Sequence, residues 1–295
     1  MLPVAMPLML AVLPVEDASE PLRYDPRGRP VVSVRVNEEG PFDMVLDTGA
    51  QSSLLSPALA ERLKLPAMDS DMRITGATGG VAAALYPVDH LANGLLEQRD
   101  VALFRFPNPQ VTTALGILGM ESFSDRQLEF DRAAGSVRTR ASGPAQGSSV
   151  ALKGRLGDNG LLRVPLIVNG VTIEALVDTG ASATIANAAA LRALGFTADD
   201  SRLAMAGQIR GATADRQGVR SAKMASVKIG PATLRDVPMY FTGAADAEAA
   251  PTIILGADLL NLFDAFALDF PRAELHIRIP GRPVAAAPPG SNQQR

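Results

Sequence analysis

Two copies of the tetrapeptide Asp-Thr-Gly-Ala have the residue types and the setting that acid–base chemistry needs. One copy occupies residues 47–50 and the other residues 178–181, and each follows an apolar stretch typical of a β-strand. A Thr and a Gly after a strand favour a sharp turn that leaves the Asp carboxylate exposed. Each tetrapeptide therefore predicts a carboxyl group presented at the end of a strand.

Asp47 and Asp178 would meet if a two-fold axis related the two copies. Two carboxyl groups at hydrogen-bonding distance cannot both ionise easily, so they share one proton. The ionised group could then take a proton from a bound water while the protonated group polarises a substrate carbonyl. Such a pair would hydrolyse an amide without a metal, a histidine or a cysteine.

The composition leaves few other catalytic groups. The chain has 295 residues and no cysteine, which excludes disulfides, thiolate metal sites and a cysteine nucleophile. His90 and His276 are the only histidines, so a site with three histidine ligands is excluded, and we expect both to be structural or solvated. We therefore expect no metal and no other cofactor.

The charge balance argues against nucleic acid as a partner. Lys and Arg number 28 against 31 Asp and Glu, which gives a net charge of −3 and no basic field for a phosphate backbone. Aromatic residues make up 4% of the chain, with no Trp, so stacking platforms for bases or sugars are few. A hydrophobic content of 47% favours a folded chain. The charged cluster at residues 121–126 is expected to form a solvated face.

The two tetrapeptides lie in a long internal repeat. Residues 31–63 and 161–194 both contain two apolar strands around a turn, then the tetrapeptide, another apolar stretch and a helix. Ser56 and Asn187 are predicted to cap the two helices. Later matches follow in the same order, with a separation that grows steadily as loop insertions would produce: 74–78 with 209–213, 99–101 with 235–237, 117–119 with 254–256, and 128–130 with 268–270.

This repeat predicts an all-β, mainly antiparallel fold with a few short helices and two pseudo-symmetric lobes. Regular alternation of strands and helices is absent, which argues against a parallel doubly wound sheet. We expect an N-terminal lobe over residues 21–140, a linker over 141–158 whose first part, residues 141–149, is flexible, and a C-terminal lobe over 159–280. Residues 281–295 lack periodicity and are expected to be disordered.

The N-terminal segment, residues 1–20, begins with an uncharged apolar run. This run is too short to cross a bilayer as a helix, so no membrane span is expected. It is similar to the apolar region of a signal peptide, which would place the protein in the periplasm or outside the cell. The alternative is a plain N-terminal strand or arm on a cytoplasmic protein.

The sequence resembles the retropepsin-like aspartic proteases. The motifs that carry the resemblance are residues 46–50 and 177–181, with the later apolar-apolar-Gly motifs at 117–119 and 254–256. The resemblance implies an acid-protease fold and an aspartic endopeptidase that acts on polypeptides. The viral relatives are homodimers, and this chain resembles two such protomers fused, so oligomerisation should not be required for the active site.

The resemblance also implies roles for individual residues. Asp47 and Asp178 would form the catalytic dyad, with Thr48 and Thr179 hydrogen-bonded across the interface. Gly49 and Gly180 would let the backbone approach the substrate. Substrate would be bound by residues of the two tetrapeptides and of two flap hairpins that close over an extended peptide: Ala50, Ala181, Gly76, Ala77, Gly211 and Ala212.

The chain departs from the viral pattern in three ways. Gln51 and Ser182 stand where an acidic residue is common, and Met120 and Ala257 stand where an Arg is common, so the ion pair that latches the viral dimers is missing. The two flaps also differ in sequence, which suggests asymmetric closure and asymmetric subsites.

Two other functions remain open from the sequence. One is a catalytically inactive peptide-binding module on the same fold, since a fold does not determine an activity. The other is a glycosidase that uses two carboxylates, although the scarcity of aromatic residues disfavours a sugar cleft.

Overall fold

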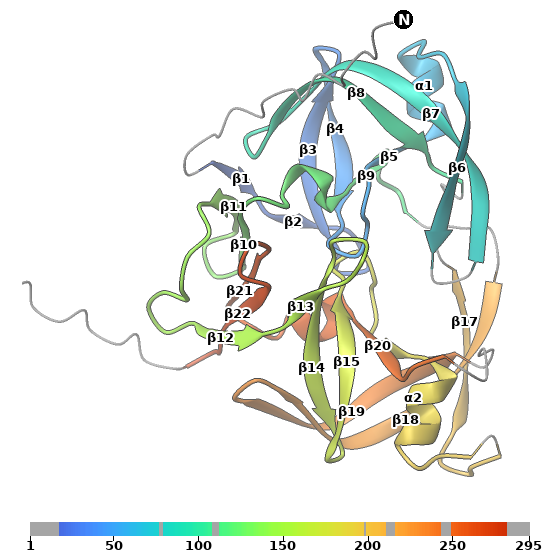
Figure 1. Cartoon of the computed structure of the whole chain (residues 1–295), viewed down its shortest axis with the longest axis vertical. Coiled ribbons are helices and arrows are strands. Elements are labelled where there is room, and N and C mark those ends of the chain that lie inside the picture. Colours follow the sequence, from blue (N-terminus) through green and yellow to red (C-terminus); the bar gives the residue numbers. More distant parts are fainter. Residues whose placement is uncertain are drawn as a thin grey trace, which may run out of the picture.

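The computed structural model describes residues 18–76, 79–107, 112–197, 199–210, 216–242 and 249–281. In these ranges the chain is mostly β-strand with a few short helices, arranged as two lobes around a shared sheet (Figure 1). The predicted all-β, two-lobed fold is confirmed. Residues 1–17 and 282–295, which hold most of the predicted N-terminal segment and tail, lie outside the described residues.

Each lobe is one eight-stranded sheet that curves back on itself. In each lobe two strands that are far apart in the sheet order also pair: β3 (Pro30–Val36) with β7 (Gly79–Ala92), and β14 (Leu162–Val168) with β18 (Arg216–Ile229). In the N-terminal lobe the order of strands is β2 (Arg23–Tyr24), β3 (Pro30–Val36), β4 (Glu39–Leu46), β9 (Gly116–Leu118), β5 (Leu54–Leu55), β8 (Glu97–Arg105), β7 (Gly79–Ala92) and β6 (Met68–Gly76).

The C-terminal lobe repeats this order strand for strand. It runs β13 (Arg155–Leu156), β14 (Leu162–Val168), β15 (Val171–Val177), β20 (Thr252–Leu255), β16 (Ile185–Ala186), β19 (Ala232–Thr242), β18 (Arg216–Ile229) and β17 (Ala204–Arg210). In both lobes most neighbouring strands are antiparallel. The strand before each Asp-Thr-Gly-Ala is an exception, because β4 and β15 pair in parallel with β9 and β20.

Alternating apolar residues explain how the first hairpin of each lobe packs. Val32, Val34 and Val36 are buried on β3 while Arg35 between them is exposed, and β14 shows the same alternation. This is the period of a strand with one face on a core. The core of each lobe therefore lies under the hairpin that leads to its tetrapeptide.

The predicted helix caps are confirmed. The Ser56 hydroxyl accepts the Leu59 N–H at 3.2 Å at the start of α1 (Pro57–Arg62), and the Asn187 side chain accepts the Ala190 N–H at 2.8 Å at the start of α2 (Ala188–Ala193). A third short helix, α3 (Ala257–Leu260), follows β20. None of the helices in the described ranges has the length and apolar composition that a bilayer crossing needs.

The two halves of the chain share a six-stranded sheet. Its order is β1 (Ser19–Pro21), β11 (Ser136–Arg140), β10 (Gln127–Asp131), β21 (Ala265–Asp269), β22 (Glu274–Arg278) and β12 (Val150–Lys153). The central pair, β10 and β21, joins one half to the other. Phe130 and Phe266 face each other in this pair, and their rings stack with centroids 4.7 Å apart.

The predicted linker over residues 141–158 is more structured than the sequence suggested. It contains β12, the outer strand of the shared sheet, and β13, the edge strand of the C-terminal lobe. Both strands are short, and β12 pairs with β22, more than a hundred residues later in the chain. Local sequence patterns do not report such distant pairing, so these two strands were not predicted from the sequence.

The last predicted match of the repeat is also wrong in its register. The hairpins β10–β11 and β21–β22 correspond, and Asp131 and Asp269 end their first strands. Each of these carboxylates accepts the backbone N–H three residues later, from Ala134 at 2.9 Å and from Arg272 at 3.1 Å. Residues 128–130 therefore match 266–268. A slip of two residues keeps apolar side chains on the same face, so the sequence pattern alone could not reveal it.

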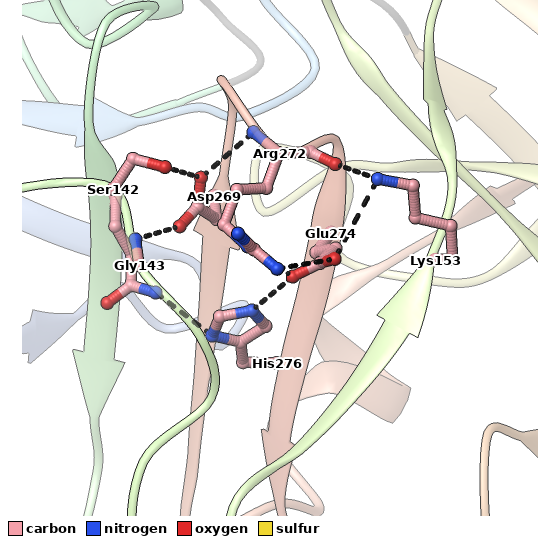
Figure 2. A network of polar contacts seen from close by, with 8 residues as sticks. Ser142, Gly143, Lys153, Asp269, Arg272, Glu274 and His276 are labelled. Carbon is pink, nitrogen blue, oxygen red and sulfur yellow. Dashed lines mark hydrogen bonds and ion pairs between the residues drawn. The ribbon is translucent and has the colours of Figure 1, made fainter.

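A polar network ties the connecting segment to the shared sheet (Figure 2). The fully buried Asp269 accepts the Ser142 hydroxyl at 2.7 Å and the Gly143 N–H at 2.8 Å. Glu274 contacts Arg272 at 2.9 Å and the buried His276 at 3.1 Å. His276 is therefore structural, as predicted.

We expect Asp269→Ala to lower the free energy of unfolding by about 3 kcal/mol, because the buried carboxylate and the three hydrogen bonds that it accepts are lost. Urea unfolding followed by circular dichroism measures this. Asp89→Ala, at an exposed position on β7, is the matched control and should change stability by less than about 0.5 kcal/mol. Equal stability of the two variants would show that the network does not hold the segment.

Candidate active site

The two aspartates are placed by the same local structure in each lobe. Asp47 follows the last residue of β4, and its N–H donates to Leu118 O on β9 at 3.0 Å. Asp178 follows β15, and its N–H donates to Leu255 O on β20 at 3.0 Å. The hydrogen bonds to the parallel partner strand therefore continue one residue beyond the end of β4 or β15. They fix the position of the backbone from which each carboxyl group projects.

Thr48 and Thr179 lock the two loops together. The N–H of each threonine donates to the hydroxyl of the other, at 3.0 Å in both directions. The Thr48 hydroxyl donates to Val177 O at 2.9 Å, and the Thr179 hydroxyl donates to Leu46 O at 2.6 Å. Both side chains are buried, so these four bonds cross the lobe interface away from water.

Gly49 and Gly180 are required by the opposite aspartate. A Cβ atom on Gly49 would lie within 2.7 Å of the Asp178 carboxyl group, and one on Gly180 would lie within 2.5 Å of the Asp47 carboxyl group. No side chain fits at either place. The sequence suggested that these glycines make room for substrate, and in the structure each makes room for the opposite carboxyl group.

The two carboxyl groups are in hydrogen-bonding contact with each other at the bottom of a cleft. Asp47 also accepts the Gly49 N–H at 2.8 Å, and Asp178 accepts the Ala181 N–H at 2.9 Å. Loss of hydration in the cleft raises the pKa of both groups, and the neighbouring negative charge of Asp47 raises the pKa of Asp178 further, well above its usual 3.8. The pair can therefore hold one shared proton.

The cleft is lined by both halves of the chain and has a volume of about 780 Å³. Ala50 and Ala181 lie on its floor beside the aspartates. Ile74 on β6 and Ile209 on β17 line it from equivalent positions of the hairpins β6–β7 and β17–β18, which are the predicted flaps. In Figure 1 these hairpins approach each other on the side away from the shared sheet.

The predicted flap residues are only partly described. Gly76 ends β6 opposite Gly79, as a hairpin requires. Ala77, Gly211 and Ala212 lie outside the described residues. Their part in binding substrate stays a prediction.

Two sets of side-chain hydrogen bonds that support the aspartate loops, one in each half and here called buttresses, were not predicted from the sequence. In the N-terminal half the Ser53 N–H donates to Glu121 at 2.9 Å, and the Ser53 hydroxyl accepts the Gly119 N–H at 2.9 Å. Glu121 is exposed as a whole, but its carboxyl group turns inward, so the prediction of a purely solvated charged cluster at 121–126 is wrong. Arg126 is buried as well.

The C-terminal half repeats this buttress. Asp258 accepts the N–H of Thr184 at 3.0 Å and its hydroxyl at 2.7 Å, while that hydroxyl accepts the Gly256 N–H at 3.1 Å. The sequence held a signal for both sites. Each half has a hydroxyl residue six places after its aspartate and an acid two places after the later glycine.

Neither histidine lines the cleft. His90 lies half-buried on β7 near Glu38 and Glu97, and His276 lies in the shared sheet. Over the part of the chain that the structure describes, no group of three or more His, Asp or Glu side chains could hold a metal ion. Of the described residues that line the cleft, Asp47 and Asp178 are the two that carry carboxyl groups.

We expect Thr48→Val to lower the free energy of unfolding by about 2 kcal/mol or more, because Thr179 N–H and Val177 O lose their partner inside the interface. Thr48→Ser keeps the hydroxyl and serves as the control. Thermal and urea unfolding of the two variants measure the difference. If valine and serine gave the same stability, the threonine bonds would not be what holds the loops together.

Comparison with known proteins agrees with this geometry. A family model described as aspartyl protease matches twice, at residues 32–122 and 164–259, once in each half of the chain. A search of curated proteins found no match. The two matches together cover more than half of the chain and include both Asp-Thr-Gly-Ala loops. The chain therefore belongs to the aspartyl protease family, in the retropepsin-like form with two repeats in a single chain.

Proposed function

We propose that the protein is an active aspartic endopeptidase that hydrolyses peptide bonds with a water activated between Asp47 and Asp178. The observation that carries the proposal is the direct contact of two half-buried carboxyl groups, with raised pKa values, at the bottom of a cleft between the lobes. No other group of the described chain that lines this cleft is a stronger candidate for a general base.

The proposed reaction uses one shared proton. The ionised carboxylate accepts a proton from the bound water as its oxygen attacks the carbonyl carbon of the peptide bond. The protonated carboxyl group donates its proton to the carbonyl oxygen, which gives a neutral tetrahedral diol. As the diol collapses, the ionised carboxylate takes a proton from one diol hydroxyl, the C–N bond breaks, and the protonated carboxyl group gives its proton to the leaving nitrogen. The pair again holds one proton.

The substrate is proposed to be a polypeptide bound in an extended form. Apolar side chains line the cleft from equivalent positions in both halves: Ile74 and Ile209, Ile117 and Ile254, and Leu54 and Ile185. These walls favour apolar substrate side chains on both sides of the cleaved bond. Closure of the flap hairpins would exclude water other than the nucleophile.

The other two functions receive less support. A glycosidase needs its two carboxyl groups about 5 Å or more apart, with sugar or water between them, whereas these two touch. An inactive peptide-binding module has no specific observation in its favour, because both aspartates are present and in contact.

Asp47→Asn and Asp178→Asn should each reduce the rate of peptide cleavage by about 10³-fold or more, because the pair can no longer exchange one proton between two carboxyl groups. Cleavage of a proteome-derived peptide library, with and without a statine-type inhibitor, can be followed by mass spectrometry. Asp89→Asn, outside the cleft, should retain full activity. Unchanged cleavage by either dyad variant would overturn the proposal.

The raised pKa of Asp178 also predicts a dependence of stability on pH. Folded Asp178 keeps its proton above 3.8, where the unfolded chain loses it, so wild-type stability falls as pH rises from 3.8 through the raised pKa. Asp178→Asn removes this titration. The free energy of unfolding of the variant, measured in urea, should therefore gain on that of the wild type as pH rises from 4 to 8. A constant difference over that range would show that the pKa of Asp178 is not raised.

A further inference from the structure

One buried charge beside the dyad has no counterpart in the other half. The turn between β2 and β3 and the turn between β13 and β14 are equivalent: Asp25 N–H donates to Arg29 O at 2.9 Å, and Gly157 N–H donates to Leu161 O at 2.9 Å. Arg29 therefore occupies the position of Leu161, and Asp25 occupies that of Gly157. Both Arg29 and Leu161 are buried, but only one is charged.

Arg29 is held in place by Asp25. Its Nε and Nη2 both donate to Asp25 Oδ2, at 2.8 and 2.5 Å, and both side chains are more than nine-tenths buried. The other oxygen of Asp25 accepts the backbone N–H groups of Arg27 and Arg29, at 2.8 and 3.0 Å. The carbonyl of Gly28 accepts the Asn261 side chain at 2.7 Å, which anchors the turn to the C-terminal half.

The guanidinium acts on one aspartate of the pair. Arg29 lines the same cleft as Asp47 and Asp178. Burial raises the pKa of Asp47, and the positive charge of Arg29 offsets part of that rise. For Asp178, burial raises the pKa and the largest effect of a neighbouring charge is that of the negative Asp47, which raises it further.

The remaining charges around the cleft add to this asymmetry. Among the residues that the structure describes, the charged ones that line it besides the two aspartates are Arg27, Arg29 and Arg73, all from the N-terminal half. The equivalent positions in the other half are uncharged: Asn159, Leu161 and Gln208. Of these three, Arg29 is the buried one, whereas Arg27 and Arg73 are exposed.

We infer that Arg29, held by Asp25, is a positioning residue that breaks the two-fold symmetry of the dyad, so that Asp47 carries the negative charge and Asp178 carries the shared proton. This inference rests on the proposed function for its meaning in catalysis. Asp47 is then the base that activates water, and Asp178 is the acid that protonates the substrate carbonyl. If these roles are fixed, an extended peptide must bind with its N-to-C direction in one orientation across the cleft.

Two substitutions test the inference because they must act in opposite directions. Arg29→Gln removes the positive charge, so the acid limb of the pH profile of kcat/KM should shift to higher pH by about half a unit or more. Asp25→Asn removes the opposing negative charge but keeps the oxygen that accepts two backbone N–H groups, so the limb should shift to lower pH. Arg29→Lys should restore the wild-type profile. If Arg29→Gln does not fold, Arg29→Leu, which copies Leu161, carries the same expectation.

The ion pair between Arg23 and Asp43 provides the matched control. It joins β2 to β4, which lie on either side of β3, at 2.6 Å, and is exposed outside the cleft. Arg23→Gln and Asp43→Asn should leave the limb unmoved. If Arg29→Gln and Asp25→Asn lowered activity together without shifting the limb, the buried ion pair would be merely structural and the inference would be overturned.

A second readout separates this inference from the proposed function. Aspartate labelled with ¹³C at Cγ allows the two dyad carboxyl groups to be titrated by NMR, with the Asn variants of Asp47 and Asp178 for assignment. Asp47 should lose its proton at lower pH than Asp178, and Arg29→Gln should raise the pH at which it does so. Absence of cleavage by the wild-type protein would refute the proposed function and leave this titration valid. Identical titration of Asp47 with and without Arg29 would refute the inference alone.

Discussion

Two carboxyl groups in contact cannot both carry a negative charge, and the rest of this structure serves to keep Asp47 and Asp178 in that contact. Like charges at hydrogen-bonding distance repel, and partial burial in the cleft removes the water that would screen them. Left alone, the two loops would move apart or take up solvent. The four threonine bonds across the interface prevent this, because separating the loops would leave buried donors and acceptors unpaired.

Three further features of the fold keep the two carboxyl groups in contact. Gly49 and Gly180 allow the approach because they have no Cβ, and the buttresses at Ser53 and Thr184 hold the ends of the loops against the segments that follow β9 and β20. The shared sheet then fixes the two lobes relative to each other through the antiparallel pair β10 and β21. A single chain supplies both halves, so equivalent positions are free to differ. Arg29 and Leu161 are such a difference, and both line the cleft that holds the two carboxyl groups.

Much of this arrangement could be predicted from the sequence because it repeats. The paired tetrapeptides, the strand alternation before them and the caps at Ser56 and Asn187 are local patterns, and local patterns determine local structure. The register of β10 against β21 and the strand at Val150–Lys153 could not be predicted, since both depend on residues far apart in the chain. The hydrogen bond from the Ser53 N–H to the Glu121 carboxyl group could not be predicted for another reason. Glu121 as a whole is exposed to solvent, as a charged residue usually is, and only the position of its carboxyl group shows the contact.

The central claim is that Asp47 and Asp178 hold one proton between them in the active protein. Neutron diffraction from crystals of the deuterium-exchanged protein, grown at the pH of maximal peptide cleavage, observes that proton directly. The account predicts nuclear density for a single deuteron between the two carboxyl groups, bonded to Asp178. Density for no deuteron, or for one deuteron on each carboxyl group, would contradict it.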